Sequence, residues 1–284
     1  MASADKTMSE LEARAVAQFD SLVQKGELFY ESTNEIKIEQ EPFDVYFRVS
    51  PITQIKPFNP NDKSRKPGFL DDDPEFTVCQ VEPNHKLILN KYCWLRPQMI
   101  LHTRDFQAQT DLLTEADFEA SLDVLRQLGG RYMVVFNGGP KAGSSVAHKH
   151  LQVFLRPEWA TIADEIVAGK SKASLPFESR LIKLPSQTRA RELFSAYQTM
   201  CKDLHLSTGD AHNLLLVKEW MMVIPRSTGT IEGEIAFAPL QGGANALIGM
   251  LWLKSHEQLE NWKRYGPMRV LSDFGVRAPG PSPG

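Results

Sequence analysis

The 284-residue sequence predicts a mixed α+β fold. Stretches with a helical repeat of apolar residues alternate along the chain with short apolar runs of strand length. Apolar residues make up 42% of the chain and charged residues 24%, which is typical of a globular protein with a large core. We expect residues 1–284 to form one domain, with an N-terminal docking helix within 1–35 and a flexible tail at 275–284.

Three segments carry helix signals. Residues 8–25 place apolar side chains on one helical stripe and end at Gly26, a suitable C-cap. Thr114 and Asp117 have the spacing of a capping box, and the helix they begin should end before a Gly-Gly pair. Residues 255–265 predict a third helix.

Short apolar or alternating runs predict the strands. The expected strands are residues 39–48, 85–92, 98–103, 132–136, 213–217 and 221–224. The run at 244–253 is apolar and expected to be buried. Residues 56–74 are rich in Lys, Pro, Asn and Asp, which favours a surface loop.

Charge and composition exclude several classes of protein. A net charge of −3 provides no overall basic field, which argues against a general nucleic-acid binder. No stretch reaches the ~18 apolar residues needed to span a bilayer, so no membrane partner is expected. The three cysteines are widely spaced and are expected to be buried thiols. We expect a cytoplasmic protein, with the nucleus as the alternative location.

The segment 137–157 carries the chemistry. If residues 148–155 form a strand, alternate side chains share a face. One face would then carry His148, His150, Gln152 and Phe154. The other would carry Lys149, Leu151, Val153 and Leu155, and is apolar apart from the lysine. The second face can pack on the core while two imidazoles and an amide line a cleft.

A neutral imidazole can attack phosphorus and leave again, so a histidine on this face is a plausible carrier of a nucleotidyl group. Gln152 can donate its amide to a phosphate oxygen but cannot remove a proton from water. Upstream, glycines and Ser144 and Ser145 favour a loop whose N–H groups bind an anion. Ser rather than Lys follows Gly143, which excludes the phosphate loop of kinases and ATPases.

Other interpretations of these histidines stay open at this point. His148 and His150 could bind a structural zinc ion, or both could be ordinary core histidines. The remaining histidines show no partner pattern and are assigned no chemistry. They are His85, His102, His205, His212 and His256.

These motifs resemble the diadenosine tetraphosphate phosphorylase family, also called ATP adenylyltransferases. The family lies in the histidine-triad and galactose-1-phosphate uridylyltransferase superfamily. The similarity is strongest in His-x-His-x-Gln at 148–152, Asn-Gly-Gly at 137–139 and Gly-Ser-Ser at 143–145. The stretches LILNKY, ending at Tyr92, and NLLLVKEWMMVIPRS at 213–227 agree with it. It implies a histidine-triad-like fold with a mainly antiparallel sheet flanked by helices.

The resemblance also implies roles for individual residues. His150 would become adenylylated, with His148 as the other catalytic histidine, and Gln152 would bind the α-phosphate. Hydrolase relatives carry a third histidine at the position of Gln152, so the glutamine favours phosphate over water as acceptor. Other implied substrate contacts are Lys56, Asn90, Lys91, Asn137, Gly143, Ser144, Ser145, Val146, Gly243, Ala244, Asn245, Met250 and Lys254.

The implied activity is phosphorolysis of diadenosine tetraphosphate to ATP and ADP, and the reverse reaction, in a single catalytic domain. Its partners are small molecules: the dinucleotide, ATP, ADP and phosphate. A divalent cation, Mg or Mn, is expected to bind with the polyphosphate, without a metal site of the protein's own. Two alternatives stay open: a uridylyltransferase acting on a sugar phosphate, and a nucleotide-binding sensor without turnover.

Overall fold

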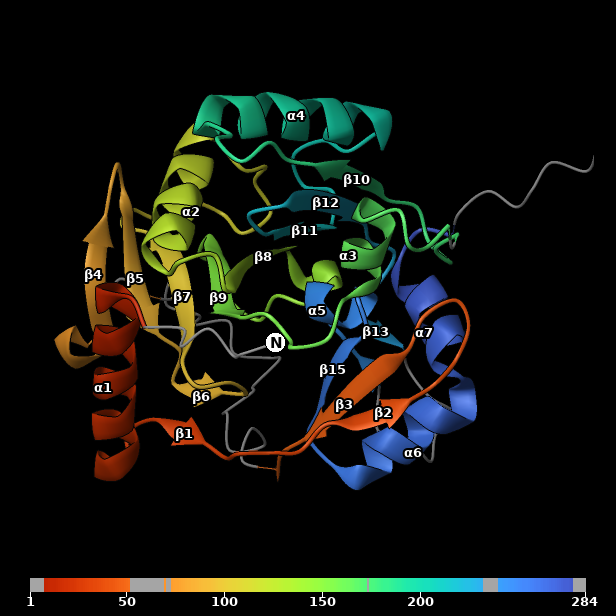
Figure 1. Ribbon diagram of the computed structural model, residues 1–284, viewed down its shortest axis with the longest axis horizontal. Coiled ribbons are helices and arrows are strands. Elements are labelled where there is room, and N and C mark those ends of the chain that lie inside the picture. Colours follow the sequence, from red (N-terminus) through yellow and green to blue (C-terminus); the bar gives the residue numbers. More distant parts are fainter. Residues whose placement is uncertain (1–7, 52–68, 70–72, 173, 232–239, 278–284) are drawn as a thin grey trace, which may run out of the picture.

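The computed structural model describes residues 8–51, 69, 73–172, 174–231 and 240–277. Its centre is an eight-stranded sheet in the order β10-β12-β11-β8-β9-β7-β5-β4, in which every neighbouring pair is antiparallel (Figure 1). The strands are β4 (Thr77–Val81), β5 (His85–Leu89), β7 (Gln98–Thr103), β8 (Tyr132–Gly138), β9 (His150–Leu155), β10 (Arg180–Lys183), β11 (His212–Leu216) and β12 (Trp220–Pro225).

Helices and smaller sheets cover the two faces of this sheet. The helices are α1 (Glu10–Lys25), α2 (Glu115–Gln127), α3 (Ile162–Val167), α4 (Ala190–Asp203), α5 (Ala244–Leu247), α6 (His256–Tyr265) and α7 (Pro267–Phe274). A three-stranded sheet contains β2 (Ile36–Ile38), β3 (Val45–Val49) and β15 (Met250–Leu253). The two-stranded pairs are β1 (Phe29–Tyr30) with β6 (Tyr92–Cys93), and β13 (Thr230–Ile231) with β14 (Leu240–Gln241).

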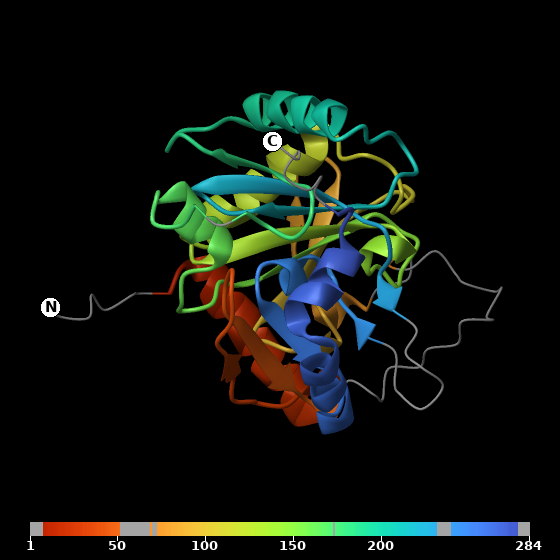
Figure 2. The same cartoon turned by 90° about the vertical axis from the view of Figure 1, so that its right-hand side faces the viewer.

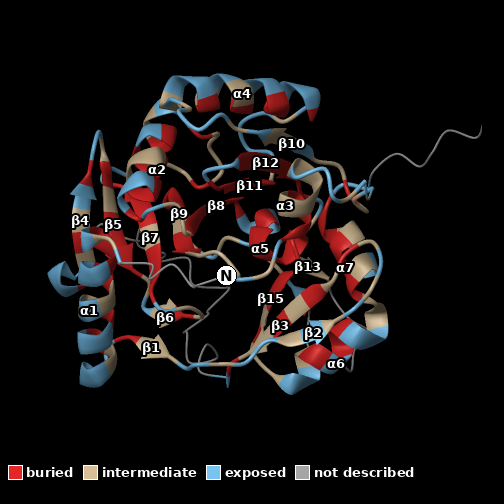
Figure 3. Ribbon diagram, in the orientation of Figure 1, coloured by how far each residue is buried: buried red, intermediate tan, exposed pale blue. Residues whose placement is uncertain are grey.

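The alternation of strand side chains divides the interior into two cores. On one face, Val134 of β8 and Leu151 of β9 pack with apolar residues of α1, α2 and α4. On the other face, Val135 and Phe154 pack with β3, α3, α5, α6, α7 and β15. Figure 2 shows α4 on one side of the sheet and α6 with the β2–β3 pair on the other. The central strands are buried on both faces (Figure 3).

The three predicted helices are confirmed. Gly26 ends α1 with a φ of 74°, a left-handed conformation that glycine adopts at little cost. The capping box of Thr114 and Asp117 begins α2, and Ser255 caps α6. α4 was not predicted, although its residues form an amphipathic helix with Leu193 and Tyr197 on the buried face.

Most predicted strands are present with shifted bounds. The expected strand at 39–48 is wrong in extent, since β2 ends at Ile38 and β3 begins only at Val45. Pro42 lies between them, and proline cannot donate a hydrogen bond to a sheet ladder. The apolar run at 244–253 is buried as expected and forms α5 and β15. The predicted tail at 275–284 lies mostly outside the described residues, as does the loop expected at 56–74.

Two further expectations concern cysteines and membranes. Cys93 and Cys201 are buried free thiols, as predicted, whereas Cys79 is only half-buried. Among the described residues, no helix is both long and apolar enough to cross a membrane.

A buried ionic cluster joins α2 to β9. Lys149 is only 1% exposed, and its Nζ lies 3.5 Å from Asp117 Oδ2. The other oxygen, Asp117 Oδ1, accepts a 2.9 Å hydrogen bond from Nε2 of the buried His85. Burial alone would raise the pKa of Asp117, but the His85 hydrogen bond and the Lys149 charge outweigh it and hold that pKa below 3.8.

Replacing Asp117 by Asn should destabilise the protein by about 3 kcal/mol at neutral pH, because Lys149 would be buried without its carboxylate. Ionised Asp117 stabilises the fold above its unfolded-state pKa of 3.8, and this contribution is lost as pH falls through the lower folded-state value. The difference between the variant and the wild type should therefore shrink below about pH 4. Urea unfolding at pH 7 and pH 3 measures both effects.

Asp123→Asn is the matched control, because Asp123 lies on the same helix and, among the described residues, accepts an exposed hydrogen bond from Gln127. Its free energy of unfolding should stay within about 0.5 kcal/mol of wild type. Equal stability of Asp117→Asn and Asp123→Asn would contradict the proposed contribution of the cluster.

Candidate active site

The predicted histidine strand lies in the middle of the large sheet. β9 pairs with β7 on one edge and with β8 on the other. It begins at His150 rather than at His148, which forms an isolated bridge with Ala108. The predicted two-face alternation is present. His150 and Gln152 lie on the face of Phe154, and Leu151 and Val153 pack in the opposite core.

The orientation of His150 assigns its ring nitrogens. Nδ1 lies 2.8 Å from the backbone oxygen of His148. A carbonyl oxygen can only accept, so Nδ1 carries the proton and Nε2 carries the lone pair. The residue is 7% exposed, so packing holds the ring in place. This tautomer is the one a nucleophilic histidine needs.

His148 is fully buried, and its backbone carbonyl oxygen is the hydrogen-bond partner of His150 Nδ1. Its own Nε2 lies 3.2 Å from the carbonyl oxygen of Asp105 and 3.0 Å from Oγ1 of Thr103. These contacts hold the chain in the conformation that points the His148 carbonyl at His150. Within the described part of the chain, no group of three His, Cys, Asp or Glu side chains could hold a metal ion.

The side-chain amide of the buried residue Gln98 orients Gln152. Gln98 Nε2 donates to Gln152 Oε1 over 2.9 Å, and Gln98 Oε1 accepts from the backbone N–H of Trp94 over 2.8 Å. Since Trp94 can only donate, the orientation of both amides is determined. Gln152 therefore keeps its N–H groups for the pocket, where they can donate to phosphate oxygens.

Beside Gln152 is a pocket of about 440 Å³. Many of the residues implied by the resemblance line it: Asn90, Asn137, Gly143, Ser144, Ser145, Gln152, Gly243, Asn245 and Lys254. Sequence segments more than 160 positions apart along the chain thus converge on one cavity, whose volume suits a nucleotide-sized ligand.

The other implied contacts are not among the lining residues of this pocket, and neither are His148 and His150. Lys91 is exposed, and its carbonyl accepts from Phe29. The Val146 carbonyl accepts from Ser144 Oγ, and the Met250 carbonyl from Asn245. Ala244 contributes its backbone N–H, which donates to Asn137 Oδ1 over 3.0 Å. Lys56 lies outside the described residues, so its contact with substrate stays a prediction.

Glycines let two loops meet at the pocket. Gly143 has a φ of 96°, and a Cβ there would lie 2.9 Å from the Cα of Gly243. A Cβ on Gly229 would lie 2.7 Å from the carbonyl oxygen of Pro140. Only residues without a side chain allow this approach, which brings backbone groups of both loops to one ligand.

A buried arginine that the sequence analysis missed joins these loops. Arg226 Nη1 donates to Asn213 Oδ1 over 2.7 Å, and Nη2 donates to the carbonyl oxygen of Gly242 over 2.8 Å. Asn213 Nδ2 in turn donates to Asn137 Oδ1 over 2.8 Å. The acceptors recorded for Arg226 are neutral, and burial lowers its pKa to about 9. A guanidinium at this position favours an anionic ligand.

Aromatic rings lie close to the two histidines. The ring of Phe69 lies 5.4 Å from the ring of His150 and stacks on His102 at 4.8 Å. His102 is the partner of His150 in the β7–β9 register. The sequence analysis assigned His102 no role, because only strand pairing brings it to this position.

Two family models match the chain in sequence order. The Ap4A phosphorylase N-terminal domain matches residues 3–165, and the ATP adenylyltransferase C-terminal domain matches residues 173–277. The chain belongs to the Ap4A phosphorylase family. This confirms the predicted family and enzyme class. Both matched regions contribute strands to the large sheet, and the expected single domain stays a prediction.

Two named proteins of Saccharomyces cerevisiae are similar to this chain in sequence. Diadenosine 5',5'''-P1,P4-tetraphosphate phosphorylase 2 is 26% identical over 274 residues, which cover 81% of this chain and 82% of the relative. Protein APA1 is 29% identical over 209 residues, covering 61% of this chain and 62% of the relative.

Solved structures share the fold of this Ap4A phosphorylase family member. Yeast Ap4A phosphorylase Apa2 has a TM-score of 0.81 at 22% identity, covering 95% of this chain and 98% of that chain. The structure of Apa2 in complex with Ap4A has a TM-score of 0.79 at 24% identity, again covering 95% and 98%. The predicted α+β fold, with a mainly antiparallel sheet flanked by helices, is confirmed.

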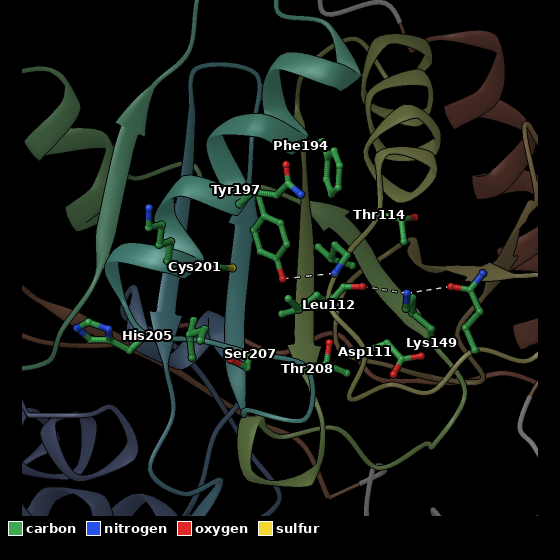
Figure 4. A pocket seen from close by; sticks show the side chains of 15 residues that line it. Asp111, Leu112, Thr114, Lys149, Phe194, Tyr197, Cys201, His205, Ser207 and Thr208 are labelled. Atoms are coloured by element: carbon green, nitrogen blue, oxygen red, sulfur yellow. Dashed lines mark hydrogen bonds between the residues drawn. The ribbon is translucent and has the colours of Figure 1, made fainter.

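A larger cavity of about 990 Å³ lies on the other side of the sheet (Figure 4). It is lined by residues that include Lys149, Tyr197 and His205, and it contains none of the residues implied to bind substrate. Strand alternation explains the separation, since Lys149 points away from the face of His150. We therefore place the candidate site of this Ap4A phosphorylase relative in the smaller pocket.

Gln98→Met should weaken the binding of AMP about tenfold, because the variant no longer fixes the Gln152 amide as a donor. Isothermal titration calorimetry measures the dissociation constant. If Gln98 acts through Gln152, the substitution should have no further effect in a Gln152→Met background. Additive losses in the double variant would contradict this coupling.

Proposed function

We propose that this chain transfers AMP from diadenosine tetraphosphate to inorganic phosphate, through an AMP group carried on His150. The observation that carries the proposal is the 2.8 Å hydrogen bond from His150 Nδ1 to the His148 carbonyl, which leaves the lone pair on Nε2. Family membership supports the reaction class, and a yeast relative is named for this phosphorylase activity. The cytoplasm is the proposed location, with small molecules as the partners.

In the first half-reaction, His150 Nε2 attacks an α-phosphorus of the dinucleotide. A nitrogen–phosphorus bond forms while the phosphorus–oxygen bond to the departing ATP breaks. Nδ1 keeps its proton and its bond to the His148 carbonyl, which stabilises the positive charge that develops on the ring. The product is an AMP group on the protein.

In the second half-reaction, an oxygen of inorganic phosphate attacks the same phosphorus. An oxygen–phosphorus bond forms, the nitrogen–phosphorus bond breaks, and ADP leaves with the lone pair restored to Nε2. Each half inverts the configuration at phosphorus, so one pocket serves both. Gln152 cannot take a proton from water, which favours an acceptor that arrives already as an anion.

Fixed donors around the pocket would supply most of the rate enhancement. The oriented N–H groups of Gln152 and the buried charge of Arg226 are in place before substrate arrives, and Ser144 and Ser145 lie in the lining of the pocket. Donors that need no reorganisation stabilise the charge spread over phosphate oxygens in the transition state.

A divalent cation, Mg or Mn, would bind with the polyphosphate. The described lining of the pocket offers amide, hydroxyl and backbone oxygens, which can complete the shell of an ion that the phosphates hold. The ion would neutralise phosphate charge, while the protein's own residues orient the phosphorus for attack.

Mixing the protein briefly with diadenosine tetraphosphate in the absence of phosphate should give an AMP-sized mass increase in intact-protein mass spectrometry. His150→Ala should give none, because the attacking nitrogen is missing. Adding phosphate to the wild-type adduct should restore the original mass and release ADP.

His205→Ala is the matched control, since His205 is exposed on the opposite side of the sheet and should not alter adduct formation. If wild-type protein forms no adduct and produces neither ATP nor ADP with phosphate present, the proposal fails. Transfer of UMP from UDP-glucose to galactose 1-phosphate would then identify a uridylyltransferase. Tight dinucleotide binding without any product would identify a sensor.

Excess chelator should reduce the rate of phosphorolysis at least tenfold, because the polyphosphate charge would no longer be neutralised. Restoring free magnesium or manganese should recover the rate. A chelator preloaded with magnesium controls for effects of the chelator itself. Full activity in excess chelator would show that no divalent ion is needed.

A further inference from the structure

Gln109 lies outside every motif considered above, yet its side chain contacts the backbone of the proposed nucleophile on both sides. The residue is 2% exposed. Its Oε1 accepts a 2.7 Å hydrogen bond from the backbone N–H of His150, and its Nε2 donates to the carbonyl oxygen of the same residue over 3.1 Å. Nε2 also donates to the carbonyl oxygen of Asn137 over 2.8 Å.

The Gln109 amide replaces one pair of backbone hydrogen bonds between β8 and β9. The β8–β9 register ends with Phe136 opposite Leu151, so one more step would pair Asn137 with His150. Instead the Gln109 amide lies between the two backbones and offers the same donor and acceptor as a peptide group. It satisfies buried backbone groups that would otherwise cost free energy.

The segment that carries Gln109 is fixed to the strand at several points. Gln109 N–H donates to the Ala147 carbonyl over 2.8 Å, and Lys149 N–H donates to the Gln107 carbonyl over 2.8 Å. On the opposite face, Lys149 Nζ donates to Gln107 Oε1 over 2.9 Å and to the Leu112 carbonyl over 3.1 Å (Figure 4). Residues 107–112 are thus held by bonds on both sides of the nucleophile strand.

The position of the amide matters for the site. Asn137 is the last residue before the glycine-rich loop that lines the pocket, and His150 begins the strand with Gln152. By bonding both backbones, Gln109 sets the separation between this loop and the nucleophile. A displacement of about 1 Å in such geometry lowers a rate on the order of a hundredfold.

We propose that Gln109 is a positioning residue that sets the backbone of His150 for attack on phosphorus. The inference rests on the proposed function, because it assumes that His150 is the nucleophile. The hydrogen bonds of the Gln109 side chain all go to backbone atoms, so its effect should fall mainly on the rate of attack and much less on nucleotide affinity. That separation distinguishes positioning from general support of the fold.

The test measures, for each variant, the rate of AMP-adduct formation from diadenosine tetraphosphate by rapid mixing and mass spectrometry, and the dissociation constant for AMP. Gln109→Met retains the length of the side chain and removes all three hydrogen bonds. It should slow adduct formation about a hundredfold while the AMP dissociation constant stays within about threefold of wild type. Where this variant does not fold, Gln109→Asn decides, because it keeps a neutral amide that is one methylene too short to make all three hydrogen bonds.

Tyr132→Phe is the matched control, since it removes the 3.0 Å buried hydrogen bond from Tyr132 to Glu12 at the interface with α1. It should lose stability and retain the adduct rate. A folded Gln109 variant with an adduct rate within threefold of wild type overturns the inference. So does a loss of adduct rate that Tyr132→Phe reproduces. Absence of any adduct in wild-type protein instead overturns the proposed function, so the two failures are distinguishable.

Discussion

The hydrogen bond from His150 Nδ1 to the His148 carbonyl is the interaction on which the candidate site depends. It spans only two residues, so the imidazole can reach that oxygen only while the chain between them keeps one extended conformation. Side-chain propensity does not hold a chain so firmly. The surrounding sheet holds it, because β9 has paired neighbours on both edges and buried side chains on both faces.

Two cores on one sheet give this strand its rigidity. Leu151 and Val153 pack under α1, α2 and α4, while Phe154 packs in the opposite core with β15 and α5. A strand buried from both sides belongs to the most stable part of a fold, where local opening is rare. The polar residues between the apolar ones are then presented by a rigid element, although each of them would be unfavourable in an ordinary core position.

The sequence was enough to predict which side chains of the histidine strand share a face, because alternate residues of a strand point the same way and the apolar set must pack on the core. The contacts that support this strand could not be predicted. Gln109 is separated from His150 by 41 positions, and its bonds go to backbone atoms, which leave no mark on residue type. Arg226 lies within a segment that agrees with the family. Its hydrogen-bond acceptors are neutral groups such as Asn213 Oδ1 and the Gly242 carbonyl, so the sequence contains no acidic partner that would have indicated a buried arginine. Lys91 and Met250 show the converse, since the resemblance implied contacts that the pocket lining does not include.

Under the proposed function, the neutral amide of Gln152 favours phosphate over water as the acceptor. A water molecule must lose a proton as it attacks, whereas inorganic phosphate arrives with an anionic oxygen that needs no base. Gln98 fixes the Gln152 amide as a donor, so that side chain can donate to phosphate oxygens and offers no basic atom to a water molecule. The buried charge of Arg226 raises the local preference for anions further. Under the proposed function, phosphate is favoured over water because Gln152 supplies no base at the position where it faces the acceptor.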